Sequence, residues 1–114
     1  MALPKTTRVR VEKMLDAFCE TKVPPHTVER VKLVYRIRGN SVTLFEQRSF
    51  PFDIDQWEES KVAQFRYDPN TKKWTLYFTD RNSRWQEHFE TPPTSSFASL
   101  LKEVDKDPTG IFWG

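Results

Sequence analysis

The sequence predicts an α+β fold, a five-stranded antiparallel meander with an N-terminal and a C-terminal helix on one face. Three observations predict it. Apolar residues recur with helical spacing near both ends of the chain, and between these ends they alternate with polar residues. Short turn motifs separate the alternating segments. Because 114 residues suffice for one domain, we expect residues 1–114 to fold as a single α+β unit.

Residues 6–21 have the pattern of an amphipathic helix. The i, i+3, i+4, i+7 positions hold Val11, Met14, Leu15 and Phe18. Thr6 or Thr7 is expected to cap its first turn. The helix must end before Pro24, because a residue that precedes proline is driven out of the helical conformation. Residues 26–29 are then expected to lead into the first strand, with or without one helical turn.

From Val31 the apolar period changes to two, which predicts a strand over residues 31–38. Gly39-Asn40 is a two-residue hairpin signal, so residues 41–48 are expected to return as the second strand. The implied register pairs Ile37 with Val42, Tyr35 with Leu44, Arg36 with Thr43 and Val34 with Phe45. One face of this hairpin is therefore apolar and the other is basic.

The second half of the chain predicts three more strands and a helix. Residues 50–60 are too apolar for a solvated linker and are expected to form a connector over the rim of the core. Strands are expected over residues 61–67, 73–79 and 85–89, joined by turns at 68–72 and 80–84. The second hairpin should pair Tyr67 with Trp74 and Phe65 with Leu76. Ser95 or Ser96 is expected to cap a short helix with apolar residues at 97, 100, 101 and 104.

Several long motifs are shared with a known family. They are YRIRGNSVTLFE (35–46), VAQFRYDP (62–69), DRNSRW (80–85) and DPTGIFWG (107–114). In these motifs the chain resembles a small bacterial family known only as a domain of unknown function. The resemblance covers nearly the whole chain, and it implies a bacterial, cytoplasmic, stand-alone protein. It implies no activity, because none is assigned to that family.

Composition excludes several classes of protein. The one cysteine, Cys19, excludes an internal disulfide, and the three glycines form no phosphate-binding loop. The two histidines and the cysteine lack the spacing of a metal site, so we expect no metal, no cofactor and no catalytic Cys–His pair. No apolar run has the length of a signal peptide or a membrane span, which predicts a cytoplasmic protein without a membrane partner.

Glu46 and Glu87 are the best candidates for catalytic acids. The predicted registers place both on apolar faces, where an unpaired carboxylate is unusual and is typical of catalytic sites. Both also lie near strand ends, where the side chain can reach solvent or pair with Arg48 or Arg84. We favour this second interpretation and expect a binding module that is not an enzyme.

The basic side of the predicted sheet is the strongest functional feature. The candidate site consists of Lys32, Arg36, Arg38, Phe45, Arg66 and Tyr77. Arginines bind phosphates, and aromatic side chains on a sheet stack on bases, so this face predicts nucleic-acid binding. The charge distribution agrees, since residues 1–50 carry ten Lys or Arg against five Asp or Glu, whereas residues 51–114 carry eight against eleven.

Two alternatives remain open for these features. Exposed arginines on a strand also protect a sheet edge from aggregation. The other alternative is a protein-interaction module, which would use a sheet edge or the C-terminal aromatic segment Ile111, Phe112 and Trp113. Such side chains are costly to expose, so the segment either docks on the domain's own sheet or is captured by a partner.

Overall fold

The computed structural model describes residues 3–23, 30–50 and 53–113. The elements are α1 (Lys5–Lys22), β1 (Val31–Arg38), β2 (Ser41–Phe50), β3 (Asp53–Asp68), β4 (Lys73–Thr79), β5 (Trp85–Glu87) and α2 (Phe97–Lys106). The predicted lead-in over residues 26–29 lies outside the described residues, as does Phe52 of the predicted connector.

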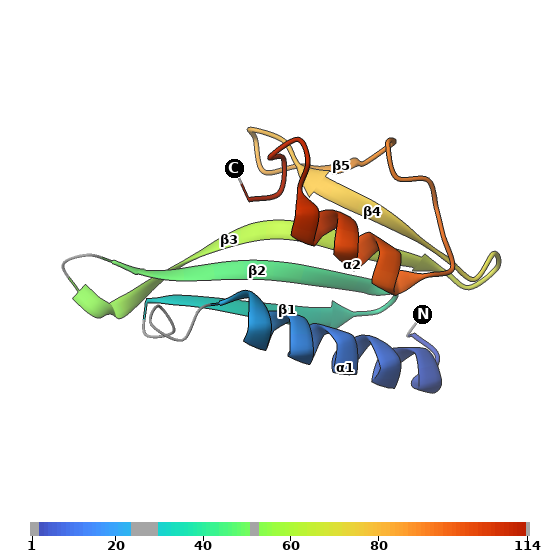
Figure 1. Cartoon of the computed structure of the whole chain (residues 1–114), viewed down its shortest axis with the longest axis horizontal. Coiled ribbons are helices and arrows are strands. Elements are labelled where there is room, and N and C mark those ends of the chain that lie inside the picture. The colour runs from blue at the N-terminus through green and yellow to red at the C-terminus, as the bar shows by residue number, and fades with distance from the viewer. Residues whose placement is uncertain (1–2, 24–29, 51–52, 114) are drawn as a thin grey trace.

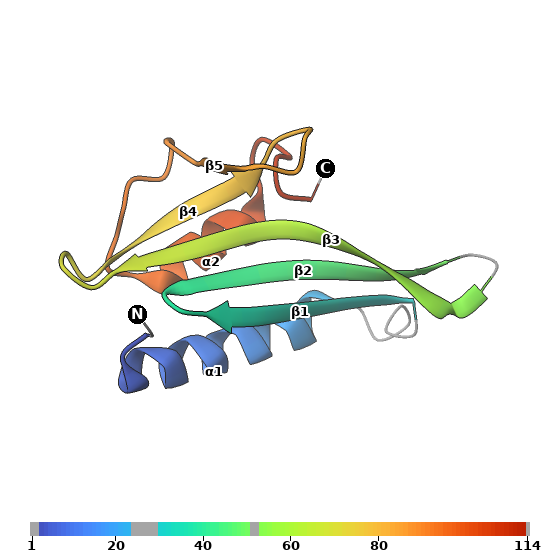
Figure 2. The same cartoon turned by 180° about the vertical axis from the view of Figure 1, so that it is seen from behind.

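The strands form one five-stranded antiparallel meander in the order β1-β2-β3-β4-β5. Both helices lie on the same face of this sheet (Figure 1). Seen from behind, the sheet lies in front of both helices and turns its other face to the viewer (Figure 2). The α+β fold with an N-terminal and a C-terminal helix is therefore confirmed.

The registers of the two predicted hairpins are also confirmed. The pairs include Tyr35 with Leu44, Arg36 with Thr43, Val34 with Phe45, Tyr67 with Trp74 and Phe65 with Leu76. Gly39 has a φ of 59° in the first hairpin turn. This left-handed conformation costs glycine no steric strain, which is why the Gly39-Asn40 signal is effective.

The predicted connector over residues 50–60 is wrong. β2 continues to Phe50 and β3 already begins at Asp53, so the described residues of this segment are strand. In the sequence, apolar residues at 50, 52 and 54 alternate with other residues, a pattern that also fits a strand. This end of β2 and β3 extends beyond the helices, so it has little core to cover (Figure 1). Pairing across the strands holds it instead, with Gln47 opposite Glu59 and Arg48 opposite Glu58.

A bulge at Val62 interrupts the pairing of β2 with β3. Leu44 pairs with Ala63, but the next residue, Phe45, pairs with Lys61. Val62 is therefore an extra residue, and beyond it the side chains of β3 exchange faces. Val62 and Ala63 are both buried, although they are neighbours on one strand.

Three element ends test the capping and boundary predictions. Ser96 caps α2 as predicted, and its Oγ accepts a hydrogen bond from the backbone N–H of Ser99 at 3.2 Å. The predicted cap at Thr6 or Thr7 is wrong, because α1 already begins after Pro4, whose φ of −55° suits a helix start. β5 ends at Glu87 rather than at residue 89, because the chain turns back at His88.

The core lies between the helices and the sheet. The helices contribute Val11, Leu15, Phe97, Leu100, Leu101 and Val104, and the sheet contributes Val42, Leu44, Val62, Ala63, Phe65, Trp74 and Leu76. Phe97 connects α2 to the sheet, since its ring centroid lies 4.7 Å from that of Phe65 and 4.9 Å from that of Trp74. The apolar sides of the helices and of the sheet thus pack together in one core layer.

The C-terminal segment docks on its own domain, which is one of the two arrangements left open by the sequence. Asp107 adopts a φ of 42° and ends α2. Its carboxylate oxygens accept hydrogen bonds from the backbone N–H groups of Phe112 (3.1 Å) and Trp113 (2.9 Å). The indole Nε1 of Trp113 donates to the carbonyl of Val104 at 2.7 Å. Phe112 is thereby buried in the core, whereas Ile111 stays 38% exposed.

This docking predicts unequal effects for two neighbouring substitutions. Because Phe112 is only 7% exposed, Phe112→Ala should lower the free energy of unfolding, by about 3–5 kcal/mol for a buried aromatic residue. Ile111→Ala should cost less than about 1 kcal/mol, since much of that side chain stays in water. Urea unfolding followed by circular dichroism measures both. Equal, small losses would show that the aromatic segment is not part of the core.

Candidate nucleic-acid interface

The surface of the sheet that faces away from the helices carries the sequence-predicted site. We call it the open face. By strand pairing and ring contacts it includes Lys32, Val34, Arg36, Arg38, Phe45, Gln47, Trp57, Glu59, Lys61, Gln64, Arg66, Tyr77, Trp85 and Glu87. All six residues of the candidate site therefore lie on one face.

Cations of the open face stack on aromatic rings. The guanidinium of Arg36 lies 4.4 Å from the ring centroid of Phe45, and that of Arg66 lies 3.8 Å from the centroid of Tyr77. The ammonium of Lys32 lies 4.3 Å from the centroid of Trp57. A positive charge over an aromatic face is attracted by the negative face of the ring, so each pair holds its members in place.

A fourth pair was not predicted from the sequence. The ammonium of Lys61 lies 5.6 Å from the ring centroid of Trp85 and donates to the carbonyl of Ser83 at 3.2 Å. Neither Trp57 nor Trp85 is among the six sequence-predicted site residues, yet both are half-buried on the open face. The signal was the alternation itself, because Trp85 opposite Thr79 shares a face with Tyr77.

A chain of polar side chains crosses the middle of the open face. Gln64 Nε2 donates to the hydroxyl of Thr43 at 2.9 Å, and Gln64 Oε1 accepts from Arg66 Nε at 2.7 Å. Arg66 is therefore oriented both by Gln64 and by the Tyr77 ring below it. Arg38, opposite Ser41 at the end of β1, is exposed and forms no ion pair with the described residues.

Glu59 places a negative charge among these cations. Its two carboxylate oxygens accept hydrogen bonds from Arg36 Nη1 (2.8 Å) and Arg36 Nη2 (2.7 Å), and Oε2 also accepts from Gln47 at 2.8 Å. These donors stabilise the ionised carboxylate and lower the pKa of Glu59 to about 2. Arg36 is consequently neutralised within the protein, whereas Arg38 and Arg66 have no such partner among the described residues.

The two candidate acids lie on different faces of the sheet, Glu46 opposite Leu33 and Glu87 opposite Tyr77. Glu46 Oε1 accepts from Arg48 Nε at 2.8 Å, which is the pairing that the sequence offered as the alternative. Glu87 lies opposite Tyr77, so its predicted position on the apolar face is wrong. The reason is the 80–84 turn, in which the carboxylate of Asp80 accepts from the backbone N–H groups of Asn82 and Arg84 and sets the register of β5.

His88, which is buried, and Cys19, which is half-buried, are the groups that could have carried other chemistry. The Nδ1 of His88 contacts the hydroxyl of Thr91, and its ring packs 5.4 Å from that of Phe112 and 5.9 Å from that of Phe78. Burial and, as the smaller cause, the nearby carboxylate of Asp16 together raise the pKa of the Cys19 thiol to about 11. No group of three His, Cys, Asp or Glu side chains in the described ranges is placed to hold a metal ion.

Comparison with known proteins identifies a family. A family model described as "Domain of unknown function (DUF3024)" matches residues 3–114, so the chain belongs to this family. No curated protein and no solved structure shows a significant match to it. Within the part of the chain that the structure describes, neither helix is long and apolar enough to cross a membrane.

The ion pair of Glu59 should make stability depend on pH. A carboxyl whose pKa is lowered on folding stabilises the folded state above its ordinary value of 4.5, and this contribution is lost as pH falls toward 2. Glu59→Gln should remove this dependence, whereas Glu58→Gln, which changes the adjacent exposed carboxylate, should retain it. Thermal unfolding of both variants and the unaltered protein between pH 7 and pH 2 measures the effect. Parallel stability curves for all three proteins would contradict the ion pair.

The raised pKa of Cys19 predicts that its thiol reacts slowly with a disulfide reagent. At pH 8 only about one thousandth of a thiol with a pKa near 11 is ionised, so the folded protein should react with a disulfide reagent about 100-fold more slowly than the urea-unfolded protein. Absorbance of the released thiolate follows both reactions. Equal rates would mean that the fold does not raise the pKa of the half-buried Cys19 thiol.

Proposed function

We propose that this member of the DUF3024 family is a non-catalytic module that binds nucleic acid through its open face. The observation that supports the proposal is the set of four cation–aromatic pairs on neighbouring strands, Lys32–Trp57, Arg36–Phe45, Lys61–Trp85 and Arg66–Tyr77. A bacterial source and a cytoplasmic location are part of the same proposal.

The chemistry of these pairs suits a nucleic-acid strand. Bases stack on aromatic rings and on arginine guanidinium planes, and each stacked base contributes about 1–3 kcal/mol. Arg66 on Tyr77 provides such a platform at the middle of the sheet, and the polar chain from Thr43 through Gln64 keeps it fixed. A base can therefore stack without ordering a mobile side chain first.

The charges of the open face have separate roles in this proposal. Arg38, Lys32 and Lys61 have no carboxylate partner among the described residues and can bind phosphates. Glu59 neutralises the charge of Arg36, so Arg36 contributes to binding through its stacking on Phe45 more than through its charge. Because these contacts do not distinguish one base from another, we expect binding with little sequence preference.

A protein-interaction module is the second candidate. It is favoured by an apolar hollow of about 420 Å³ between the end of β5 and the C-terminal segment. Phe89, which is 82% exposed, and Ile111 lie at this hollow. A protein partner would engage these side chains, or the unpaired edge of β1, without displacing Phe112 from the core.

The proposal is tested by fluorescence anisotropy with labelled single-stranded RNA, single-stranded DNA and duplex DNA. At low salt the protein should bind, and log K should fall linearly with log salt. The double variant Arg38→Ala/Arg66→Ala should weaken binding about tenfold or more, and it should lower the salt slope by about 1 because Arg38 is the phosphate contact of this pair.

The matched control is Arg8→Ala/Lys13→Ala, which removes two charges from α1 on the other side of the sheet. It should leave affinity and salt slope nearly unchanged. Flat titrations at tens of micromolar protein would refute the proposal, as would equal losses in both double variants. In that case Phe89→Ser becomes the first variant for a search for protein partners.

A further inference from the structure

A cavity of about 360 Å³ lies between the N-terminal half of α1, the turn from β3 to β4 and the start of α2. We call it the interhelix cavity. Its lining includes Arg10, Met14, Tyr67, Lys72, Ser95 and Ser96, and no acidic residue. We propose that it binds a small organic anion, a phosphate or carboxylate group attached to an apolar body.

The positive charge of this cavity comes from separate elements. Arg10 belongs to α1, whereas Lys72 lies in the hairpin turn, where its φ of 58° and the hydrogen bond from its backbone N–H to the carbonyl of Asp68 (2.7 Å) fix its backbone. Neither side chain forms an ion pair within the described ranges. Both exposed side chains line a cavity that has no carboxylate in its lining, so an anion bound there would balance their positive charge.

Hydroxyl groups and the N-terminus of α2 also favour a negatively charged ligand in this cavity. Ser95 and Ser96 line the cavity, and Ser96 caps the backbone N–H of Ser99. The first-turn N–H groups of a helix have no acceptor within the helix, and the helix dipole places partial positive charge there. These groups supplement the two cations and do not define the site by themselves.

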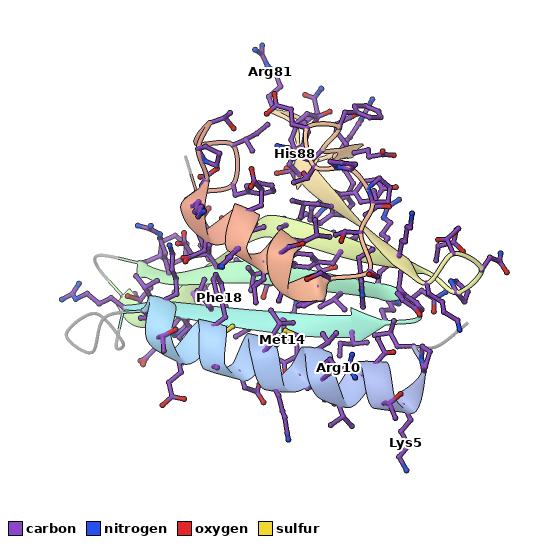
Figure 3. All side chains as sticks on the ribbon, turned by 45° about the vertical axis from the view of Figure 1, so that its right-hand side comes forward. Lys5, Arg10, Met14, Phe18, Arg81 and His88 are labelled. Carbon is purple, nitrogen blue, oxygen red and sulfur yellow. The ribbon has the colours of Figure 1, made fainter. Side chains whose placement is uncertain are left out.

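The apolar part of the cavity lining accounts for the apolar body of the proposed ligand. Met14 and Tyr67 are partly buried against the core beside the lining residue Trp74, which is only 2% exposed. Arg10, Met14 and Phe18 project from the same side of α1, toward the sheet and α2 (Figure 3). A second hollow shares Met14 and continues past Phe18 to Leu101. The anionic group therefore fits at Arg10 and Lys72, with the apolar body directed toward Met14.

This site is separate from the proposed nucleic-acid interface. The cavity lies on the helix side of the sheet, whereas Arg38 and Arg66 lie on the open face. A ligand of the cavity and a strand on the open face can therefore be tested independently, and the failure of one proposal leaves the other standing.

The test is a titration of the ¹⁵N-labelled full chain followed by NMR, with phenyl phosphate as the probe. Amide shifts should move at the start of α2 and around Met14. Inorganic phosphate and benzyl alcohol, which each supply half of the chemistry, should both bind at least about tenfold more weakly. Arg10→Gln and Lys72→Gln should each weaken binding of phenyl phosphate about tenfold, because each removes a charged contact.

Lys73→Gln is the matched control. Lys73 is the neighbour of Lys72, but it lies opposite Asp68 in the strand register and is not part of the cavity lining. Its loss should therefore leave the affinity unchanged. The proposal is overturned if phenyl phosphate causes no local shifts up to about 10 mM. It is equally overturned if the Arg10 and Lys72 variants bind like the control, or if benzyl alcohol or inorganic phosphate binds as well as phenyl phosphate.

Discussion

The bulge at Val62 is the constraint on which both faces of the molecule depend. Lys61 and Arg66 are five positions apart, so regular alternation would place them on opposite sides of the sheet. The extra residue reverses the alternation, and both side chains reach the open face, opposite Phe45 and Ser41 respectively. The same bulge buries Val62 and Ala63 together under the helices. One irregularity in β3 therefore completes the core and assembles the cationic surface.

The cation–aromatic pairs explain how one sheet face remains without a covering layer. Four aromatic side chains on an uncovered sheet would form a large apolar patch, which is an aggregation hazard. Lysine and arginine place their apolar stems along such surfaces and keep their charged groups in water. The open face is thus stable without a second layer, and it combines a stacking surface with positive charge, on which the proposed function rests.

The helix face is held together by a few polar contacts between distant segments. The hydroxyl of Tyr35 donates to Asp16 at 2.6 Å and connects β1 to α1, while Lys22 Nζ lies 2.9 Å from Asp105 Oδ1 and connects α1 to α2. Lys22 also lies 5.2 Å from the ring centroid of Trp113. The contacts of Lys22 join the C-terminal ends of the two helices, whereas the interhelix cavity lies between the N-terminal half of α1 and the start of α2.

The local pattern of the chain determined the helices, the hairpin registers and the sharing of one face by Lys32, Arg36 and Arg38, because side-chain direction follows directly from the periods of helix and strand. It also predicted the Ser96 cap and the placement of all six candidate site residues on one face of the sheet. Only the tertiary structure decided where β3 begins and that Val62 is a bulge, since strand pairing between distant segments has no local signal. Likewise, the partners of Arg36 and Trp57, the docking of Phe112 and the convergence of Arg10 with Lys72 depend on contacts between residues far apart in the chain.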